Sequence, residues 1–184
     1  NLWSTIGPFP SDYLKDGGHN EADVKKSLAV MYPPEREIRM DAVYKSDDGG
    51  ELRWLQSDSL DGPVMTEGVN FKIRNGVKRS KICYAVTFIE SPSDRTAEIR
   101  VSCDYWANLF LNGKEIESSR NPSGRRKDGA WFNGVTRIAA SIALKKGQNI
   151  LLAKVQGGSG GSSFTFSMTD PGDLKFAPGP ASNK

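Results

Sequence analysis

The sequence predicts an all-β chain that folds as an antiparallel two-sheet β-sandwich. Short segments in which apolar and polar residues alternate recur along most of its length, as expected for half-buried strands. Turn-forming Gly, Pro, Asn and Asp residues separate these segments. Only one stretch, Glu21 to Met31, has a helical pattern, with Asn20 as its N-cap and Pro33-Pro34 as its stop.

The predicted strands, in chain order, are 2–7, 37–44, 51–55, 64–73, 81–90, 97–103, 107–111, 114–118, 135–144, 149–155 and 163–168. Asn112-Gly113 joins two of them and predicts a type I′ hairpin turn, in which both central residues have positive φ. The stretch 145–149 predicts a second tight turn, with Gly147 in the left-handed conformation.

Length and composition favour one water-exposed module. The chain has 184 residues and a net charge of +3, and its mean hydropathy is -0.50. We assign residues 1–170 to the sandwich and the proline-rich residues 171–184 to a tail or linker. No apolar run approaches the length of a membrane span, and basic and acidic residues are too evenly mixed to indicate nucleic-acid binding. Because the first residue is Asn1, we expect a processed or excised piece of a protein.

The two cysteines test the alternation of two strands. If Ile82 and its even-numbered neighbours share a face with Ile99 and its odd-numbered neighbours, Cys83 and Cys103 point to opposite faces. We therefore predict that the two thiols are not joined in a disulfide.

Four blocks of sequence occur in an order that resembles a known family. They are "WSTIGPFP", "YPPE", "YAVTFIESPSDRTAEIRVSCDYWANLFLNGKEI" and "LKKGQNILLAKVQGGSGGSSFTFSM". Together they are similar to the galactose-binding-like jelly-roll modules of bacterial extracellular proteins, many of which act on polysaccharides. The resemblance implies a secreted, non-catalytic, carbohydrate-binding module beside other domains of a larger chain. The chain departs from the family pattern at Tyr105, where a second acidic residue is usual, and at Phe110, where Trp is usual.

Catalytic motifs are missing from the sequence. The single histidine, His19, lies in a polar glycine-rich stretch with no nucleophile pattern beside it, and no serine-hydrolase, zinc-protease or phosphate-loop motif is present. No pair of carboxylates stands out for glycoside hydrolysis. Hydrolase or lyase activity is therefore the third hypothesis, after carbohydrate binding and a structural or protein-interaction module without a sugar ligand.

The candidate ligand site lies in the stretch 119–134. Trp131 and Asn133, flanked by glycines, share it with Arg125 and Arg126, which predicts an aromatic platform beside guanidinium groups and a preference for acidic or sulfated polysaccharide. The alternative is a tryptophan that folds back as a lid over one end of the sandwich.

Two more aromatic residues, Tyr105 and Trp106, are candidates at a strand entrance. We expect Trp106 to be partly exposed there, with burial in the core as the alternative. Four other aromatic residues are assigned to the core: Trp3, Trp54, Phe164 and Phe166. Related jelly rolls often hold a structural calcium ion, and Asp47, Asp104 and Asp170 are of the right type, but their spacing assigns no site.

Overall fold

The structure is a computed structural model that describes residues 2–11, 21–46, 48–56, 66–70, 76, 80–104, 106–118, 135–158 and 162–180. Within these ranges the side chains of residues 21, 66–70, 104 and 135–137 are not described.

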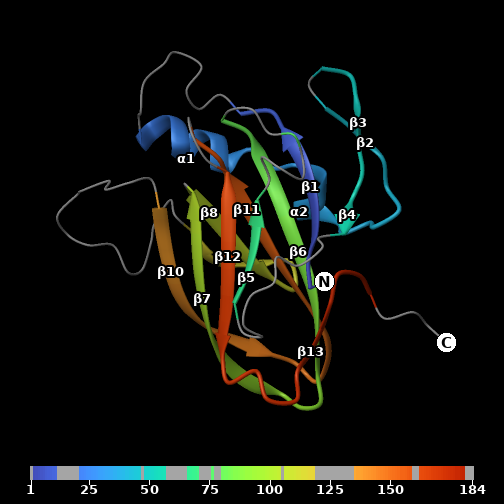
Figure 1. Cartoon of the computed structure of the whole chain (residues 1–184), viewed down its shortest axis with the longest axis vertical. Helices are drawn as coiled ribbons and strands as arrows, with labels where there is room; N and C mark the ends of the chain where they lie inside the picture. Colours follow the sequence, from blue (N-terminus) through green and yellow to red (C-terminus); the bar gives the residue numbers. More distant parts are fainter. Residues whose placement is uncertain are drawn as a thin grey trace.

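Two antiparallel sheets form the body of the molecule (Figure 1). The larger sheet has the strand order β4-β1-β6-β11-β8-β9, and β13 also pairs with β6. Its strands are β1 (Ser4–Phe9), β4 (Leu55–Gln56), β6 (Ile82–Ser91), β8 (Trp106–Leu111), β9 (Lys114–Ser118), β11 (Gly147–Gln156) and β13 (Lys175–Ala177). The smaller sheet has the order β10-β7-β12-β5, with β5 (Thr66–Asn70), β7 (Arg95–Asp104), β10 (Val135–Leu144) and β12 (Ser163–Thr169). The predicted fold class is therefore confirmed.

The inner core lies between the two sheets. Trp3 is its largest member, and its ring meets Phe164 and Phe166 edge-on, with centroids 5.0 and 5.3 Å apart. The core assignment of these three residues is confirmed. Leu109 of β8 and Ile99 of β7 are fully buried in the same cluster, one from each sheet.

An outer core covers the opposite face of the larger sheet. Helices α1 (Glu21–Ala29) and α2 (Pro33–Arg36) and the two-stranded pair of β2 (Tyr44–Lys45) and β3 (Glu51–Leu52) belong to this third layer. Its buried members are Ile6, Phe9, Val24, Leu28, Leu52, Ile82, Tyr84, Val86, Phe88, Trp106 and Leu152. Trp54, expected in the core, is half-buried against this cluster.

The register argument for the cysteines is wrong, although its conclusion is confirmed. Strands β6 and β7 do not pair but belong to different sheets, and β6 is buried on both of its faces. The even-numbered Ile82 faces the outer core, whereas Cys83 faces the inner core together with Cys103. Both thiols are nevertheless free, and burial raises the pKa of Cys83 above its usual value.

The predicted helix is confirmed, but it ends at Ala29, before the prolines predicted as its stop, and its predicted N-cap, Asn20, lies outside the described residues. Pro33 begins a second, one-turn helix instead, because proline is tolerated in the first turn, where its missing N–H would have no partner. The predicted strand 37–44 is also wrong, since only Tyr44 and Lys45 pair as strand. Ile38, Met40 and Tyr44 pack against the outer core while Arg39 and Asp41 are exposed, so the alternation arises without a ladder of hydrogen bonds.

Trp106 is 5% exposed and belongs to the outer core, so the expectation of partial exposure is wrong and the core alternative holds. Its strand, β8, lies inside the larger sheet between β11 and β9. An even-numbered side chain at the start of β8 therefore points into the layer under the helices rather than into solvent.

The segment assigned to a tail or linker packs against the sandwich over part of its length. Residues 175–177 form β13, which pairs with Glu90, Ile89 and Phe88 of β6. Leu174 is buried in the inner core, and the Ser4 hydroxyl donates a 2.7 Å hydrogen bond to the carbonyl of Pro178. Residues 175–178 thus lie close to the N-terminal strand, as the red ribbon next to the label N in Figure 1 shows.

Positive φ values occur where the turn residues predict them. Asn112 and Gly113 have φ of 51° and 78°, which confirms the type I′ hairpin between β8 and β9. Gly147 has φ of 91°, but its turn passes from the smaller sheet to the larger one. Gly7 has φ of 143°, and a Cβ atom there would lie 2.6 Å from the Cys83 sulfur, so no larger residue fits.

Candidate functional site

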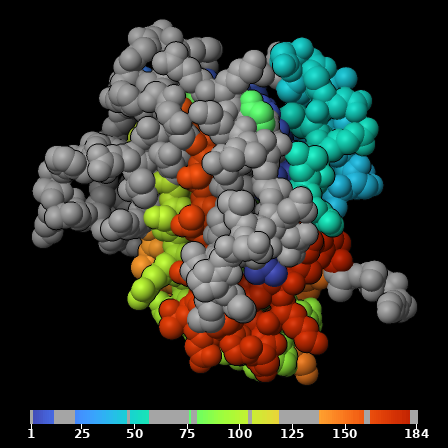
Figure 2. Space-filling model, viewed as in Figure 1, coloured from blue at the N-terminus to red at the C-terminus, as the bar shows by residue number. Residues whose placement is uncertain are grey.

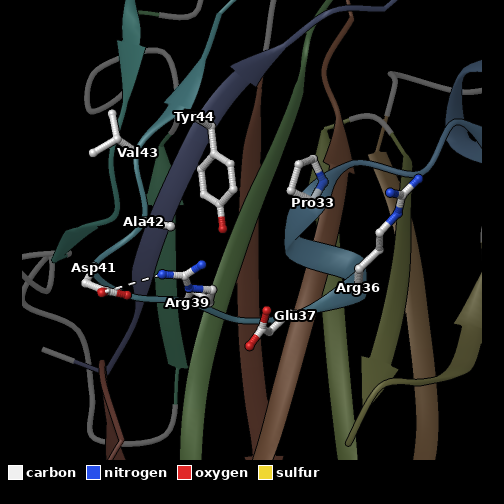
Figure 3. Close-up of a pocket in the computed structure, with 8 residues that line it drawn as sticks. All are labelled: Pro33, Arg36, Glu37, Arg39, Asp41, Ala42, Val43 and Tyr44. Carbon is white, nitrogen blue, oxygen red and sulfur yellow. Dashed lines mark ion pairs between the residues drawn. The ribbon is translucent and has the colours of Figure 1, made fainter.

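A solvent-open pocket of about 500 Å³ lies between α2 and β2. All of its lining residues fall within one stretch of the chain, from Pro33 to Tyr44. Figure 3 shows the Tyr44 ring pointing into the pocket with its hydroxyl toward the Arg39 guanidinium, whereas Val43 points away. In Figure 2 the cyan part of the chain that follows the pocket residues stands out as a lobe at one upper corner of the molecule.

Tyr44 is held in place by the outer core. Its ring meets Phe9 of β1 edge-on, with centroids 6.3 Å apart, and its backbone pairs with Leu52 of β3. Burial raises the pKa of the Tyr44 phenol above its usual value, while Arg39 opposes the rise and Glu37 adds to it. The hydroxyl therefore stays protonated at neutral pH and can both donate and accept a hydrogen bond.

The charged groups of the pocket are exposed and balanced. Arg39 and Asp41 form an ion pair with atoms 3.9 Å apart, and their side chains are 57% and 82% exposed. An exposed pair of this kind is weak, so both groups are available to a ligand. Arg36 and Glu37 add one further charge of each sign.

A buried polar network holds α2 against the larger sheet. Lys154 of β11 has a fully buried side chain, and its ammonium lies 2.8 Å from the Glu35 carboxylate, whose side chain is 7% exposed. Tyr84 of β6 donates a 2.5 Å hydrogen bond to the same Glu35 oxygen. This network was not among the features predicted from the sequence. A lysine within the otherwise apolar "NILLAKV" was the available signal.

Most of the site residues predicted from sequence lie outside the described residues. This is the case for Tyr105, Arg125, Arg126, Trp131 and Asn133. The site they form stays a prediction.

The calcium expectation also stays a prediction. Asp47 and the side chain of Asp104 are not described, and Asp170 is exposed in a turn with φ of 50°. Within the part of the chain that the structure describes, no three His, Cys, Asp or Glu side chains gather closely enough to hold a metal ion. Among those same residues, no helix has the length and apolar character needed to cross a membrane.

Comparisons with known proteins find similarity only among solved structures. No family model matches the sequence, and no curated protein matches it. A family 35 carbohydrate-binding module from an environmental isolate shares 15% identity over 55% of this chain and 74% of its own, with a TM-score of 0.36. A family 35 module from Clostridium thermocellum shares 15% identity over 60% of this chain and 84% of its own, also with a TM-score of 0.36.

A β-glucosidase from Kluyveromyces marxianus in complex with glucose shares 15% identity over 51% of this chain, which spans 12% of that protein, with a TM-score of 0.37. The β-sandwich of the present chain is established by its own strand topology. Carbohydrate-binding modules are among the structures to which it is similar.

Proposed function

We propose that the chain is a non-catalytic carbohydrate-binding module and that the pocket between α2 and β2 binds a sugar. The observation that carries this proposal is a solvent-open pocket with an aromatic ring and exposed guanidinium and carboxylate groups around it. The volume of about 500 Å³ falls within the range of small-molecule pockets, roughly 300–1,000 Å³.

The apolar part of the pocket suits one face of a pyranose ring. Sugar rings present flat patches of C–H groups, which pack against aromatic and aliphatic side chains. Tyr44 and Pro33 supply such surfaces, and the contact of Tyr44 with Phe9 fixes its ring before a ligand arrives. A fixed aromatic side chain loses little conformational entropy on binding.

The polar part of the pocket suits the hydroxyl groups around the sugar. Carboxylates accept hydrogen bonds from hydroxyls, and guanidinium groups donate to them. Arg39 and Asp41 are exposed and only weakly paired, so a ligand can displace their mutual contact at little cost. Since the two basic and two acidic side chains balance, this pocket by itself favours a neutral sugar unit.

The predicted preference for acidic or sulfated polysaccharide is a separate part of the proposal. It rests on the composition of the stretch with Arg125, Arg126 and Trp131, which would form a second contact region for an anionic chain. Secretion and attachment to neighbouring domains are proposed with it, because polysaccharides are extracellular ligands for modules of larger proteins.

Affinity electrophoresis tests the function and locates the site. The wild type, Tyr44→Ala and Trp131→Ala run on gels with galactomannan or polygalacturonate, at low and moderate salt. We expect retardation of the wild type and an affinity loss of roughly 3- to 10-fold for Tyr44→Ala, the value of one aromatic contact. Leu55→Ala is the control, because Leu55 is 44% exposed and does not line the pocket.

The other outcomes separate the alternatives. If only Trp131→Ala loses affinity, the site is the stretch around Trp131 and not the pocket. If no polysaccharide retards the wild type, the structural or protein-interaction function replaces carbohydrate binding. If the wild type and both variants are retarded equally, the sugar site is neither the pocket nor the stretch around Trp131. Release of reducing ends from either polysaccharide would show that the chain is an enzyme.

A further inference from the structure

Lys154 occupies a position that an apolar residue would ordinarily fill. It lies near the end of β11, one of the central strands of the larger sheet, and its side chain is fully buried under the helices. An ammonium group has three N–H bonds, and three oxygens accept them here. They are the carbonyls of Leu28 and Val30, at the end of α1, and the Glu35 carboxylate of α2.

The Glu35 carboxylate is the second centre of the network. One of its oxygens accepts hydrogen bonds from the Lys154 ammonium, the Tyr84 hydroxyl and the backbone N–H of Tyr32, at 2.8, 2.5 and 3.2 Å. The Tyr32 and Tyr84 rings also lie 5.8 and 5.9 Å from the ammonium nitrogen, within the range of a cation–π contact. Two helices and two strands thus converge on one buried ion pair.

One wall of the pocket is attached directly to this ion pair. Helix α2 is a single turn, and a helix of four residues does not persist without tertiary contacts. Glu35 lies within it, between the pocket residues Pro33 and Arg36. The outer surface of the turn therefore lines the pocket while its inner surface carries the carboxylate that Lys154 holds.

The opposite wall is attached through aromatic rings. Phe9 stacks on Tyr32 with centroids 4.9 Å apart, and it meets Tyr84 and Tyr44 edge-on at 5.5 and 6.3 Å. The Tyr44 ring that projects into the pocket thus rests, through Phe9, on the same two tyrosines that flank the Lys154 ammonium.

We propose that Lys154 and Glu35 are positioning residues for the pocket, which set the distance between α2 and Tyr44 and thereby the pocket's affinity for sugar. This inference deepens the proposed function and rests on it. The ion pair touches no ligand. It acts by holding the two walls in one arrangement, so that a bound sugar does not have to order them.

The test separates positioning from general stability. The double variant Glu35→Gln/Lys154→Met removes both charges together, with side chains of similar length, so that no buried charge is left alone. We expect it to fold and unfold cooperatively but to bind the galactomannan or polygalacturonate that retards the wild type at least 5-fold more weakly. Ile89→Val, which removes a methyl group from the inner core, is the control and should change the affinity less than 2-fold.

Amide hydrogen exchange gives a readout that needs no ligand. The N–H groups of Glu37 and Ala42 bond to the carbonyls of Pro33 and Arg39, within the pocket segment. In the double variant we expect their exchange to be at least 10-fold faster, with the β11 amides of Leu151 and Ala153 unchanged. In Ile89→Val the four amides should keep their relative rates.

The results distinguish failure of the positioning role of Lys154 and Glu35 from failure of the proposed sugar-binding function. If Tyr44→Ala loses affinity and the double variant binds like the wild type, the positioning role is wrong and the pocket stands. If no polysaccharide retards the wild type, the proposed function fails, and the affinity role attached to Lys154 and Glu35 fails with it. Unchanged exchange at Glu37 and Ala42 in the double variant would overturn the positioning role in either case.

Discussion

The two faces of the larger sheet are buried by different means. On the inner face, β6 and β11 present Cys83, Ala85, Leu151, Ala153 and Val155, all of them in the inner core, against the smaller sheet. On the outer face, the neighbouring positions of the same two strands include Tyr84, Lys154 and Gln156, each fully buried beside apolar residues. Apolar side chains dominate the inner layer, whereas the outer layer adds a hydrogen-bonded network around Lys154 and Gln156.

The two faces differ because they are covered by different kinds of secondary structure. The smaller sheet has its own hydrogen-bond ladders and needs only a complementary apolar surface. The outer layer contains a nine-residue helix, a one-turn helix and a pair of two-residue strands, and the strand pair forms a sheet of its own that joins neither of the two large sheets. Directional bonds from Lys154 to α1 and α2 supply the placement that apolar contacts leave open.

The Gln156 amide makes a second arrangement of this kind in the same last turn of α1. Its oxygen accepts hydrogen bonds from the hydroxyls of Ser27, in α1, and Ser11, which follows β1, at 2.6 and 2.7 Å. Its nitrogen donates to the carbonyl of Gly157 at 2.7 Å. Lys154 and Gln156 are two residues apart on β11, so both side chains face the outer layer. Their hydrogen bonds hold α1 and α2 against the larger sheet.

Loss of one charge should have the largest effect on stability. Lys154→Met leaves the Glu35 carboxylate buried without its counter-charge, and we expect it to lower the free energy of unfolding by about 3–5 kcal/mol. Urea unfolding of the wild type and the variant measures this loss in the free energy of unfolding. The double variant Glu35→Gln/Lys154→Met should lose far less, because no charge is stranded, and a double variant as unstable as Lys154→Met alone would contradict this account.

Tyr84→Phe should have an intermediate effect that depends on pH. It removes the hydrogen bond to the Glu35 carboxylate, a contact to a charged group worth about 1.5–3 kcal/mol. Burial raises the pKa of the Tyr84 phenol above its usual value, and Glu35 adds to the rise. The phenol ionises near pH 10 in the unfolded chain, so its contribution is complete below that pH and is lost as the pH rises above it.

Urea midpoints between pH 8 and pH 11 check this prediction. Above pH 10 one such phenol removes about 1.4 kcal/mol of stability per pH unit. The wild type should therefore lose stability more steeply than Tyr84→Phe, and the two curves should converge as the pH rises. Parallel curves would show that Tyr84 is not the group responsible. Tyr44→Phe is the matched comparison, since burial also raises the pKa of Tyr44, but at the pocket surface.

The sequence predicted the elements of the sandwich better than their partners. Alternation and turn chemistry are local, so the Asn112-Gly113 hairpin could be predicted from its own residues. Which sheet a strand joins is not local, and the prediction paired β6 with β7 because they are consecutive. The nearly continuous apolar run of β6 is the pattern of a strand buried on both faces, which single-face alternation cannot describe.

The pocket could not be predicted because its segment has the pattern of a strand. Ile38, Met40 and Tyr44 alternate with exposed residues, yet they pack against a layer of helices and rings without joining a sheet. Glu35 and Lys154 are 119 residues apart, and nothing local relates them. A lysine within an apolar strand indicates that a buried partner exists, but the sequence does not show which residue it is. The predicted site around Trp131 lies outside the described residues and stays a prediction.

The smallest effect should come from matched methyl deletions on the two faces of β6. Ile82 and Ile89 are both fully buried on this strand, Ile82 in the outer core and Ile89 in the inner core. Ile82→Val and Ile89→Val each remove one methylene equivalent, which costs about 0.5–1.5 kcal/mol in a packed core. We expect equal losses within about 0.5 kcal/mol, because apolar packing is the component that the two faces share.

The same pair of variants tests whether the outer layer unfolds with the sandwich. If the three layers form one cooperative unit, both variants shift the whole urea transition by the same amount, and every probe reports one midpoint. If the outer layer opens first, Ile82→Val destabilises only that layer, and amide exchange rises at Glu37 and Ala42 while β7 and β12 keep their protection. Cooperative behaviour is expected, because Lys154 and Gln156 fix the outer layer to a strand that also forms part of the inner core.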